Sequence, residues 1–188
     1  DYSAPAMQEL PGGQWEELTA RLEGMQGFSR TGISAAMTVG GWLSILSIVA
    51  FGAVNRKFGT SAMTVAGLLG TAASFAIIAF APNFAAFAVG IAGFYVFSCA
   101  YGVVAIGSLG ANWFPKKKGM YMAIATMGTT LGSASISAIM FGLVGAVGLR
   151  AMWLIFAGVC VALAVVTGLF VKNNPEEAGA FPDNDRGE

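Results

Sequence analysis

Long apolar runs separated by short polar breaks dominate the pattern of this chain. Each run exceeds the roughly 20 residues that a helix needs to cross the hydrocarbon core of a bilayer. The runs cover about residues 31–54, 60–81, 84–112, 119–144 and 150–171, and none contains Asp, Glu, Lys, Arg or His apart from Arg150 at a boundary. Strands of a membrane barrel would be shorter and would alternate in polarity. The pattern therefore predicts an all-α membrane protein with five transmembrane helices.

The composition and the placement of charges agree with this prediction. The chain of 188 residues is 56% hydrophobic and only 11% charged, whereas about a quarter of the residues in a soluble domain are charged. All ten acidic residues lie within residues 1–23 or 176–188, so the net charge of zero hides a strong segregation. These features argue against a soluble domain, and we expect the lipid bilayer, not a nucleic acid, as the surroundings of the chain.

The basic residues predict the orientation in the membrane. If the breaks alternate between the two sides, one side carries seven basic residues and the other carries three. The first group is Arg56, Lys57, Lys116, Lys117, Lys118, Lys172 and Arg186, and the second is Arg21, Arg30 and Arg150. Short cytoplasmic loops are enriched in Lys and Arg. We therefore expect a multi-pass protein of the plasma membrane whose C-terminal tail is cytoplasmic.

This orientation divides the chain into three parts. Residues 1–30 form an extracytoplasmic loop, in which residues 14–28 (QWEELTARLEGMQGF) have the apolar spacing of a short amphipathic helix. Residues 31–171 form the transmembrane bundle, and residues 172–188 form a cytoplasmic tail or the start of an interdomain linker. Pro115, which follows Trp113 and Phe114, is expected in the first turn of the next helix.

Three stretches of the sequence resemble a known family. NWFPKKKGMYMAIATMGTTLG (112–132) resembles the junction between the fourth and fifth helices of major facilitator superfamily transporters, in particular the oxalate/formate antiporter and monocarboxylate-porter branch. PEEAGAFPDND (175–185) is similar to the segment after the sixth helix of that branch. SAPAMQEL and GFSRTGIS (3–10 and 27–34) are similar to the loop between its first two helices.

The resemblance implies a function and missing partners. It implies a secondary active transporter, such as an antiporter, that moves a small organic anion such as a mono- or dicarboxylate by alternating access. The five spans would be helices two to six, so the chain would be a fragment that lacks the first helix and the second six-helix half. A non-transporting membrane subunit, or a degenerate transporter half that acts as an interaction module, is the alternative.

The breaks on the predicted cytoplasmic side are candidates for a gate. They contain Gly52, Arg56, Lys57, Gly59, Lys116, Lys117 and Lys118. In the resembling family an Asp stands in the first of these loops, and the spacing from Gly52 to Gly59 puts Arg56 at that position. Arg56 and Lys57 then either set the topology or belong to a rewired gate.

Small residues at four-residue spacing predict close helix contacts. The candidates are Gly40, Gly128, Gly132 and Ser133. Such spacing lets helix backbones approach closely in membranes. The same smooth contacts would also suit the rocking of two transporter halves, and the sequence leaves both interpretations open.

The chemistry of the spans favours binding over catalysis. The chain has no histidine, and Cys99 and Cys160 lie in different spans, so we expect no metal site, no cofactor and no enzyme activity. Hydroxyl and aromatic side chains are the candidates for a substrate cavity: Trp42, Tyr95, Ser98, Tyr101, Thr126 and Thr130. Ser98, Tyr101 and Ala105 would share one helix face, and packing alone would also account for these residues. No basic residue lies within 58–115 or 119–149, so the charge of an anion would have to be met by the missing half.

Overall fold

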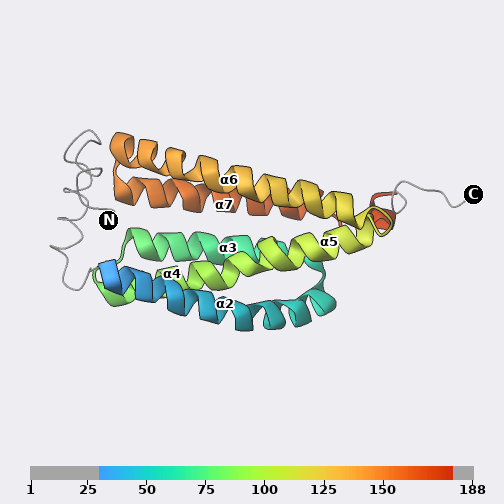
Figure 1. The fold of residues 1–188 in the computed structure, drawn as a ribbon, viewed down its shortest axis with the longest axis horizontal. Helices are drawn as coiled ribbons and strands as arrows, with labels where there is room; N and C mark the ends of the chain where they lie inside the picture. Colours follow the sequence, from blue (N-terminus) through green and yellow to red (C-terminus); the bar gives the residue numbers. More distant parts are fainter. Residues whose placement is uncertain (1–29, 180–188) are drawn as a thin grey trace, which may run out of the picture.

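Five membrane-spanning helical segments make up the computed structural model, which describes residues 30–179 (Figure 1). The elements are α2 (Arg30–Phe58), α3 (Thr60–Ala79), α4 (Phe84–Cys99), the π-helical turn η1 (Ala100–Val104), α5 (Ala105–Trp113), α6 (Lys118–Val147), α7 (Leu149–Phe170) and the 3-10 turn η2 (Pro175–Ala178). The segments α4, η1 and α5 form one continuous span. The predicted all-α membrane fold is confirmed, whereas the amphipathic helix expected at 14–28 lies outside the described residues.

Two helix boundaries differ from those expected from the sequence. α2 continues to Phe58, so Arg56 and Lys57 lie in its last turn, where basic side chains interact favourably with the helix dipole. α6 begins only at Lys118, so Pro115 precedes the helix and is not in its first turn. The rings of Phe114 and Tyr121 stack with centroids 5.4 Å apart. This stack joins the connection to the first turn of α6.

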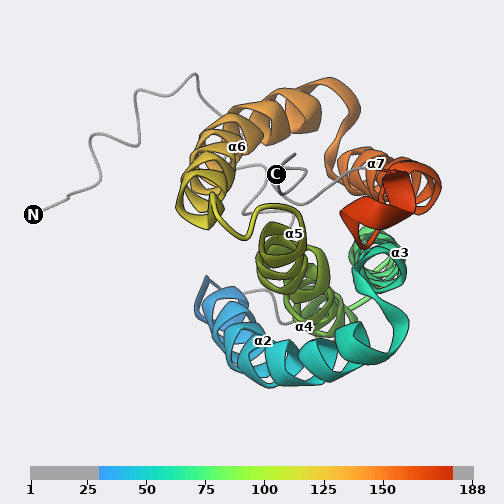
Figure 2. The ribbon, with the colours of Figure 1, turned by 90° about the vertical axis from the view of Figure 1, so that its right-hand side faces the viewer.

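α3 is the central helix of the bundle. It packs against α4 on one side and against α7 on the other, and α2 packs against α4 (Figure 2). Met63 of α3 is buried with Ala100, the first residue of the π turn, and Ala105, the residue that follows the turn. A second buried cluster joins α2, α3 and α4 through Ala36, Ile78 and Ile91. α6, in contrast, contacts mainly α7 and α5 and lies at the edge of the arrangement.

The hairpins α2–α3 and α6–α7 are built in the same way. Each turns through a single glycine with nearly the same backbone angles, φ 83° and ψ 164° at Gly59 and φ 82° and ψ 166° at Gly148. Four residues after each glycine stands a methionine that is 1% exposed, Met63 or Met152. The sequences FGAVNRKFGTSAM (51–63) and FGLVGAVGLRAM (141–152) share this framework. The turns lie at opposite ends of the bundle (Figure 1), so the hairpins form an inverted structural repeat.

The two hairpins differ in their neighbours. α4 packs along both α2 and α3. Among residues 30–179, no helix takes the corresponding place beside α6 and α7. As a result, no α6 residue whose exposure the structure describes is buried inside the bundle.

Candidate functional site

The six residues proposed for a substrate cavity lie in three parts of the bundle. Trp42 is on α2, with 72% of its surface exposed. Tyr95 and Ser98 are on α4, and Tyr101 is in η1. Thr126 and Thr130 are on α6, which has its main contacts with α5 and α7. The six residues thus lie on three membrane-spanning segments, and two of them, Thr126 and Thr130, line the depression described below.

Tyr95 packs at the crossing of α2 and α4. A Cβ atom added to Gly40 would lie 2.7 Å from Cδ2 of Tyr95, so the ring occupies the space that this glycine leaves open. Ser98 is one turn further along and donates a hydrogen bond from Oγ to the carbonyl oxygen of Tyr95 at 3.0 Å. The contact of Tyr95 with α2 depends on the absence of a side chain at Gly40.

The π turn changes the helix face on which the Tyr101 side chain lies. A regular α-helix would put Ser98, Tyr101 and Ala105 on one face, as the sequence analysis assumed. A π turn accommodates one more residue per turn than the α-helix and so shifts the faces that follow. Tyr101 lies next to α3: its Cδ1 would be 3.5 Å from a Cβ atom on Gly67, and its phenol interacts with the side chain of Thr71. Tyr101 thus belongs to the interior between η1 and α3.

Thr71 is the polar group of this interior that sequence reasoning missed. Its side chain is completely buried, and its hydroxyl has no hydrogen-bond partner within hydrogen-bond geometry among the described residues. Tyr101 approaches it without completing a hydrogen bond. Leaving a buried hydroxyl unpaired costs about 1–3 kcal/mol. Such a group is a candidate for a hydrogen bond that forms only in another conformation.

Replacing Thr71 by valine should therefore stabilise the resting structure. Valine has the same shape and no hydroxyl, so we expect the free energy of unfolding to rise by about 1 kcal/mol. Thr64→Val on the same helix is the matched control, because the Thr64 hydroxyl already donates to the Thr60 carbonyl oxygen at 2.7 Å. Thermal unfolding in detergent measures both variants. If Thr71→Val is the more destabilising of the two, the Thr71 hydroxyl has a partner in the resting state.

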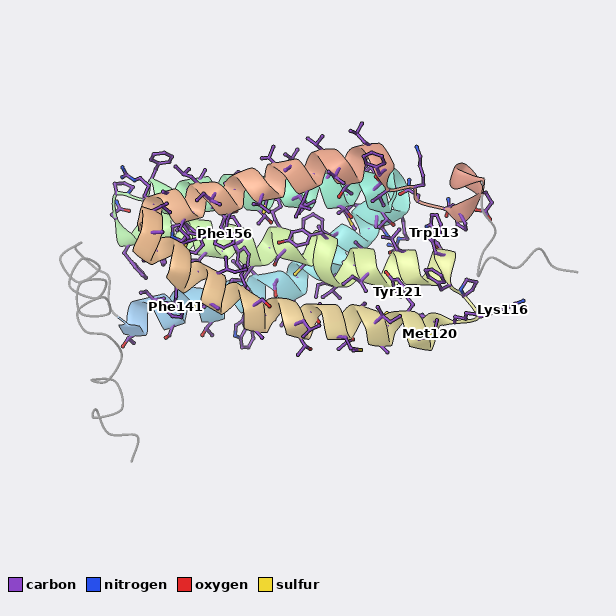
Figure 3. All side chains as sticks on the ribbon, turned by 90° about the horizontal axis from the view of Figure 1, so that it is seen from above. Trp113, Lys116, Met120, Tyr121, Phe141 and Phe156 are labelled. Atoms are coloured by element: carbon purple, nitrogen blue, oxygen red, sulfur yellow. The ribbon has the colours of Figure 1, made fainter. Side chains whose placement is uncertain are left out.

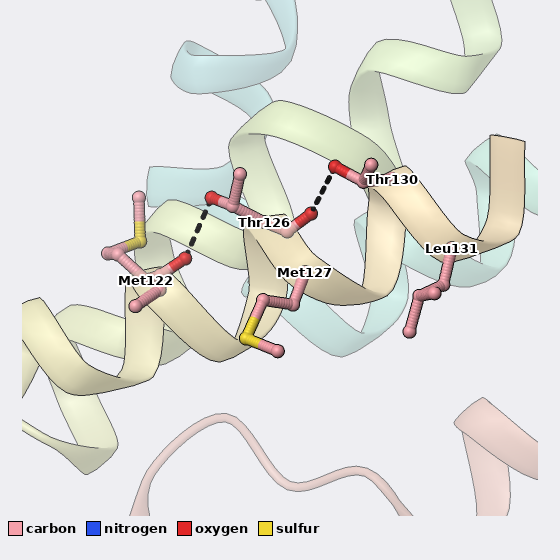
Figure 4. Close-up of a pocket in the computed structure, with 6 residues that line it drawn as sticks. Met122, Thr126, Met127, Thr130 and Leu131 are labelled. Atoms are coloured by element: carbon pink, nitrogen blue, oxygen red, sulfur yellow. Dashed lines mark hydrogen bonds between the residues drawn. The ribbon is translucent and has the colours of Figure 1, made fainter. Parts of the chain in front are cut away.

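Thr126 and Thr130 line a shallow depression on α6 (Figure 4). Its volume is about 560 Å³, and its other lining residues are Met122, Ala123, Met127 and Leu131. The hydroxyl of Thr126 donates to the Met122 carbonyl oxygen at 2.8 Å, and that of Thr130 donates to the Thr126 carbonyl oxygen at 3.0 Å. With their protons directed to the main chain, both hydroxyls offer mainly acceptor lone pairs. The depression is therefore apolar and uncharged.

The four residues proposed for helix packing differ in their surroundings. Gly40 is tightly packed against Tyr95. Gly128 and Gly132 have no atom within 4 Å of an added Cβ atom, apart from their own helix and neighbours. Ser133 is exposed and donates to the Thr129 carbonyl oxygen at 2.8 Å. Within the described chain the α6 residues therefore pack against no other helix, because the face that carries them is uncovered.

At the end of the bundle that carries the α2–α3 turn, Asn55 points inward and Arg56 points outward. Asn55 donates from Nδ2 to Oγ of Ser108 on α5 at 2.6 Å, and its Oδ1 accepts from the Thr60 hydroxyl at 2.9 Å. Arg56 and Lys57 are exposed. The neutral Asn55, one residue before the position expected for the family's Asp, thus makes the contacts within the bundle.

The other loop candidates have separate roles. Gly52 lies inside α2 with open space beside it, whereas Gly59 forms the turn. Lys116 and Lys117 lie in the connection between α5 and α6, and Lys118 is the first residue of α6. None of these residues is buried. Gly59 is therefore the structural element of the α2–α3 turn, and the three lysines are exposed at the α5–α6 connection.

Asn173 links the segment after α7 to the beginning of α3. Its Oδ1 accepts a hydrogen bond from the backbone N–H of Ser61 at 2.8 Å, as an N-cap residue would. Asn112, at the end of α5, donates from Nδ2 to the carbonyl oxygen of Asn173 and to Oδ1 of Asn174, both at 3.2 Å. Sequence reasoning missed these residues. The sequence feature that could have identified them is the occurrence of uncharged amides at the ends of apolar spans.

The described residues contain no group of three or more His, Cys, Asp or Glu that could hold a metal ion. Cys99 and Cys160 are both free thiols. Sγ of Cys99 lies 3.4 Å from the carbonyl oxygen of Tyr95 and 3.6 Å from that of Ser44. The geometry offers hydroxyl, amide and aromatic groups between helices, which suit non-covalent contacts.

Comparison with known families agrees with this architecture. A family model described as Major Facilitator Superfamily matches residues 14–187. No curated protein and no solved structure matches the chain significantly. The match covers all five membrane-spanning segments and the segment after α7. The chain therefore belongs to the Major Facilitator Superfamily, a family of membrane transporters.

Proposed function

We propose that this chain is part of a secondary active transporter of the plasma membrane that moves a small organic anion, such as a mono- or dicarboxylate, by alternating access. The observation that carries the proposal is the exposure of α6. This helix is long and apolar enough to span a membrane, yet none of its span is buried inside the bundle. Its exposed surface includes Thr126 and Thr130 on one side and Gly128 and Gly132 on another, which suit contact with a substrate and with a second moving half.

The charge pattern supports a division of labour between two halves. An unpaired anion within the bilayer is strongly disfavoured. From residue 58 to 115 and from 119 to 149 the chain has no basic residue. Hydroxyl and aromatic groups, such as those of Trp42, Tyr95 and Thr126, would contact the neutral parts of the substrate. A second six-helix half would supply the cationic group, as the resemblance to oxalate/formate antiporters also implies.

The inverted repeat supports a further helix beside α6 and α7. The hairpin α2–α3 packs against the helix α4, which follows it. α4 also precedes the hairpin α6–α7, so the inverted repeat predicts a corresponding helix that precedes residues 1–30 and packs along α6 and α7. This partner would be the first helix of a six-helix half. The end of the bundle with Arg56 and Lys116 would face the cytoplasm, and residues 1–30 would lie outside.

Uptake of labelled carboxylates into proteoliposomes tests the proposal. We expect exchange by a protein that contains this chain together with a second six-helix half, and no exchange by residues 1–188 alone. A cysteine at position 117 should react with an impermeant reagent only from the cytoplasmic side. If the two-half protein exchanges no carboxylate, or if residues 1–188 alone exchange it efficiently, the proposed function is wrong.

The glycines of α6 provide a variant that separates folding from transport. A leucine at Gly128 meets open space within this chain, so the folded yield should stay unchanged. If the second half packs on this face, the same leucine should lower uptake by at least about tenfold, because close backbone contact would be lost. Gly158→Leu on α7 is the control, since Gly158 is also exposed and has open space. Normal uptake by Gly128→Leu would contradict a contact there.

A further inference from the structure

Basic residues surround one end of the bundle, which we call the basic end. Arg56 and Lys57 lie in the last turn of α2, and Lys172 follows α7. The three lysines 116–118 connect α5 to α6. All six side chains are exposed. Figures 1 and 3 show that the end of α2, the connection with Lys116 and the segment after α7 lie at this same end.

The turn between α2 and α3 does not require its charges. The inverted hairpin α6–α7 makes a turn with the same backbone angles at Gly148. The three residues before Gly148 are Gly, Ala and Val, whereas Arg, Lys and Phe precede Gly59. Since uncharged residues before the glycine form the same turn, Arg56 and Lys57 serve a purpose other than shaping it.

The described chain holds little negative charge to balance these residues. Between residues 30 and 179 the acidic residues are Glu176 and Glu177. At the basic end, the neutral side chains of Asn55, Asn112 and Asn173 make the hydrogen bonds between segments. Arg56 makes no ion pair with another described residue, and Lys57 lies over the Phe58 ring with its Nζ 5.3 Å from the centroid. Among the described residues, this end therefore carries six basic residues and two acidic ones.

Apolar surface continues directly from the charged side chains. Val54 and Phe58 flank Arg56 and Lys57 and are 38% and 60% exposed. Met120 lies two residues after Lys118 and is 61% exposed. Cationic groups at the ends of membrane-spanning helices, with exposed apolar side chains beside them, match a phospholipid, whose charged headgroup lies above its acyl chains. Each basic residue near an anionic membrane surface contributes about 1 kcal/mol.

We propose that the basic end binds anionic phospholipids, whose headgroups lie against Arg56, Lys57 and the lysines 116–118 in the membrane. This binding needs only that the chain spans a bilayer, and it does not depend on which substrate is transported. It also goes beyond a role in topology. A topological role is complete once the helices have been inserted, whereas lipid binding persists in the mature protein.

The test measures which lipids the purified full chain retains. The protein is placed in nanodiscs of phosphatidylglycerol and phosphatidylcholine in equal amounts, extracted in mild detergent, and its bound lipids are quantified by mass spectrometry. We expect phosphatidylglycerol to be enriched. The enrichment should fall about fivefold for each basic residue removed in R56Q/K57Q and in K116Q/K117Q/K118Q. It should be unchanged in R21Q/R30Q, which removes two charges that the sequence predicts on the opposite side of the membrane.

Four further arms keep the outcome decisive. On the unaltered protein, raising the salt concentration should reduce the enrichment, a result that does not depend on the folding of any variant. R56K/K57R should retain the enrichment because the charges are kept. Equal enrichment in R56Q/K57Q and R21Q/R30Q would overturn the proposal. Loss of the enrichment in millimolar inorganic phosphate would also overturn it. So would an enrichment that is seen only after residues 180–188, which include Asp183, Asp185 and Glu188, have been removed.

Discussion

Replacing Gly67 by alanine should destabilise the bundle by about 2–3 kcal/mol, the upper part of the range for an overpacked core. Gly67 lies on α3 where that helix crosses the π turn. The added Cβ atom would lie 2.6 Å from Cβ of Ala100 and 3.1 Å from the carbonyl oxygen of Phe97. Neither atom belongs to a flexible side chain, and Ala100 is completely buried. Relief therefore requires movement of the α3 and η1 backbones.

Thermal unfolding in detergent and the folded yield measure this effect. Gly41→Ala and Gly128→Ala are controls, because a Cβ atom on either residue meets nothing within 4 Å. Alanine favours the helix over glycine by about 1 kcal/mol, so both controls should be neutral or slightly stabilising. Ala100→Gly in the Gly67→Ala background removes the closer of the two contacts and should restore part of the lost stability. Equal stability of Gly67→Ala and Gly128→Ala would show that α3 and η1 are not closely packed there.

The membrane spans were predictable because their signal is local. A run of 20 or more apolar residues without charge has few alternatives to a transmembrane helix. The predicted starts of the five spans are within one residue of α2, α3, α4, α6 and α7. The largest difference is at the end of α2, where Arg56 and Lys57 continue the helix. A charged residue marks the end of the apolar region, whereas the hydrogen-bonded helix can extend past it into the headgroup region.

Which glycines are packed was not predictable from spacing alone. Small residues four apart occur on α2, α3, α4 and α6, but a one-dimensional pattern does not say which helix face meets a neighbour. Gly40 meets Tyr95, and Gly90 of α4 meets the side chain of Ile78 and the carbonyl oxygen of Ser74. Gly128 meets open space. The difference arises from topology, since α4 covers the first hairpin and no described helix covers the second.

The polar contacts of the bundle were also beyond a local reading. Asn173 caps α3 from 112 residues away, and Asn55 reaches Ser108 across 53 residues. The loop residues proposed from the sequence are mostly charged, whereas neutral amides make these contacts. The π turn has no clear signature in AYGVV either, yet it decides that Tyr101 lies beside α3. Both features depend on contacts between helices that are remote in sequence.

The glycines of the two repeated turns should both resist substitution, but to different degrees. With φ near +83° and ψ near 165°, Gly59 and Gly148 occupy a backbone region that is essentially restricted to glycine. Alanine at Gly148 should therefore cost about 2 kcal/mol from backbone strain alone, since its Cβ atom meets open space. At Gly59 the same strain applies, and the Cβ atom would also lie 2.8 Å from Nδ2 and 2.9 Å from Oδ1 of Asn173.

Asn173 could avoid this contact only by moving away from Ser61, whose N–H it caps. Gly59→Ala should therefore cost about 1 kcal/mol more than Gly148→Ala, the usual effect of losing a helix cap. Asn173→Ala alone should cost the same amount. Both changes remove the same hydrogen bond between Asn173 and Ser61. The loss of stability in the double variant Gly59→Ala/Asn173→Ala should therefore be smaller than the sum of the losses in the two single variants. Thermal unfolding of the four variants measures these differences. If the two glycine variants are equally stable and the effects of Gly59→Ala and Asn173→Ala add, Asn173 does not hold the segment after α7 against the start of α3.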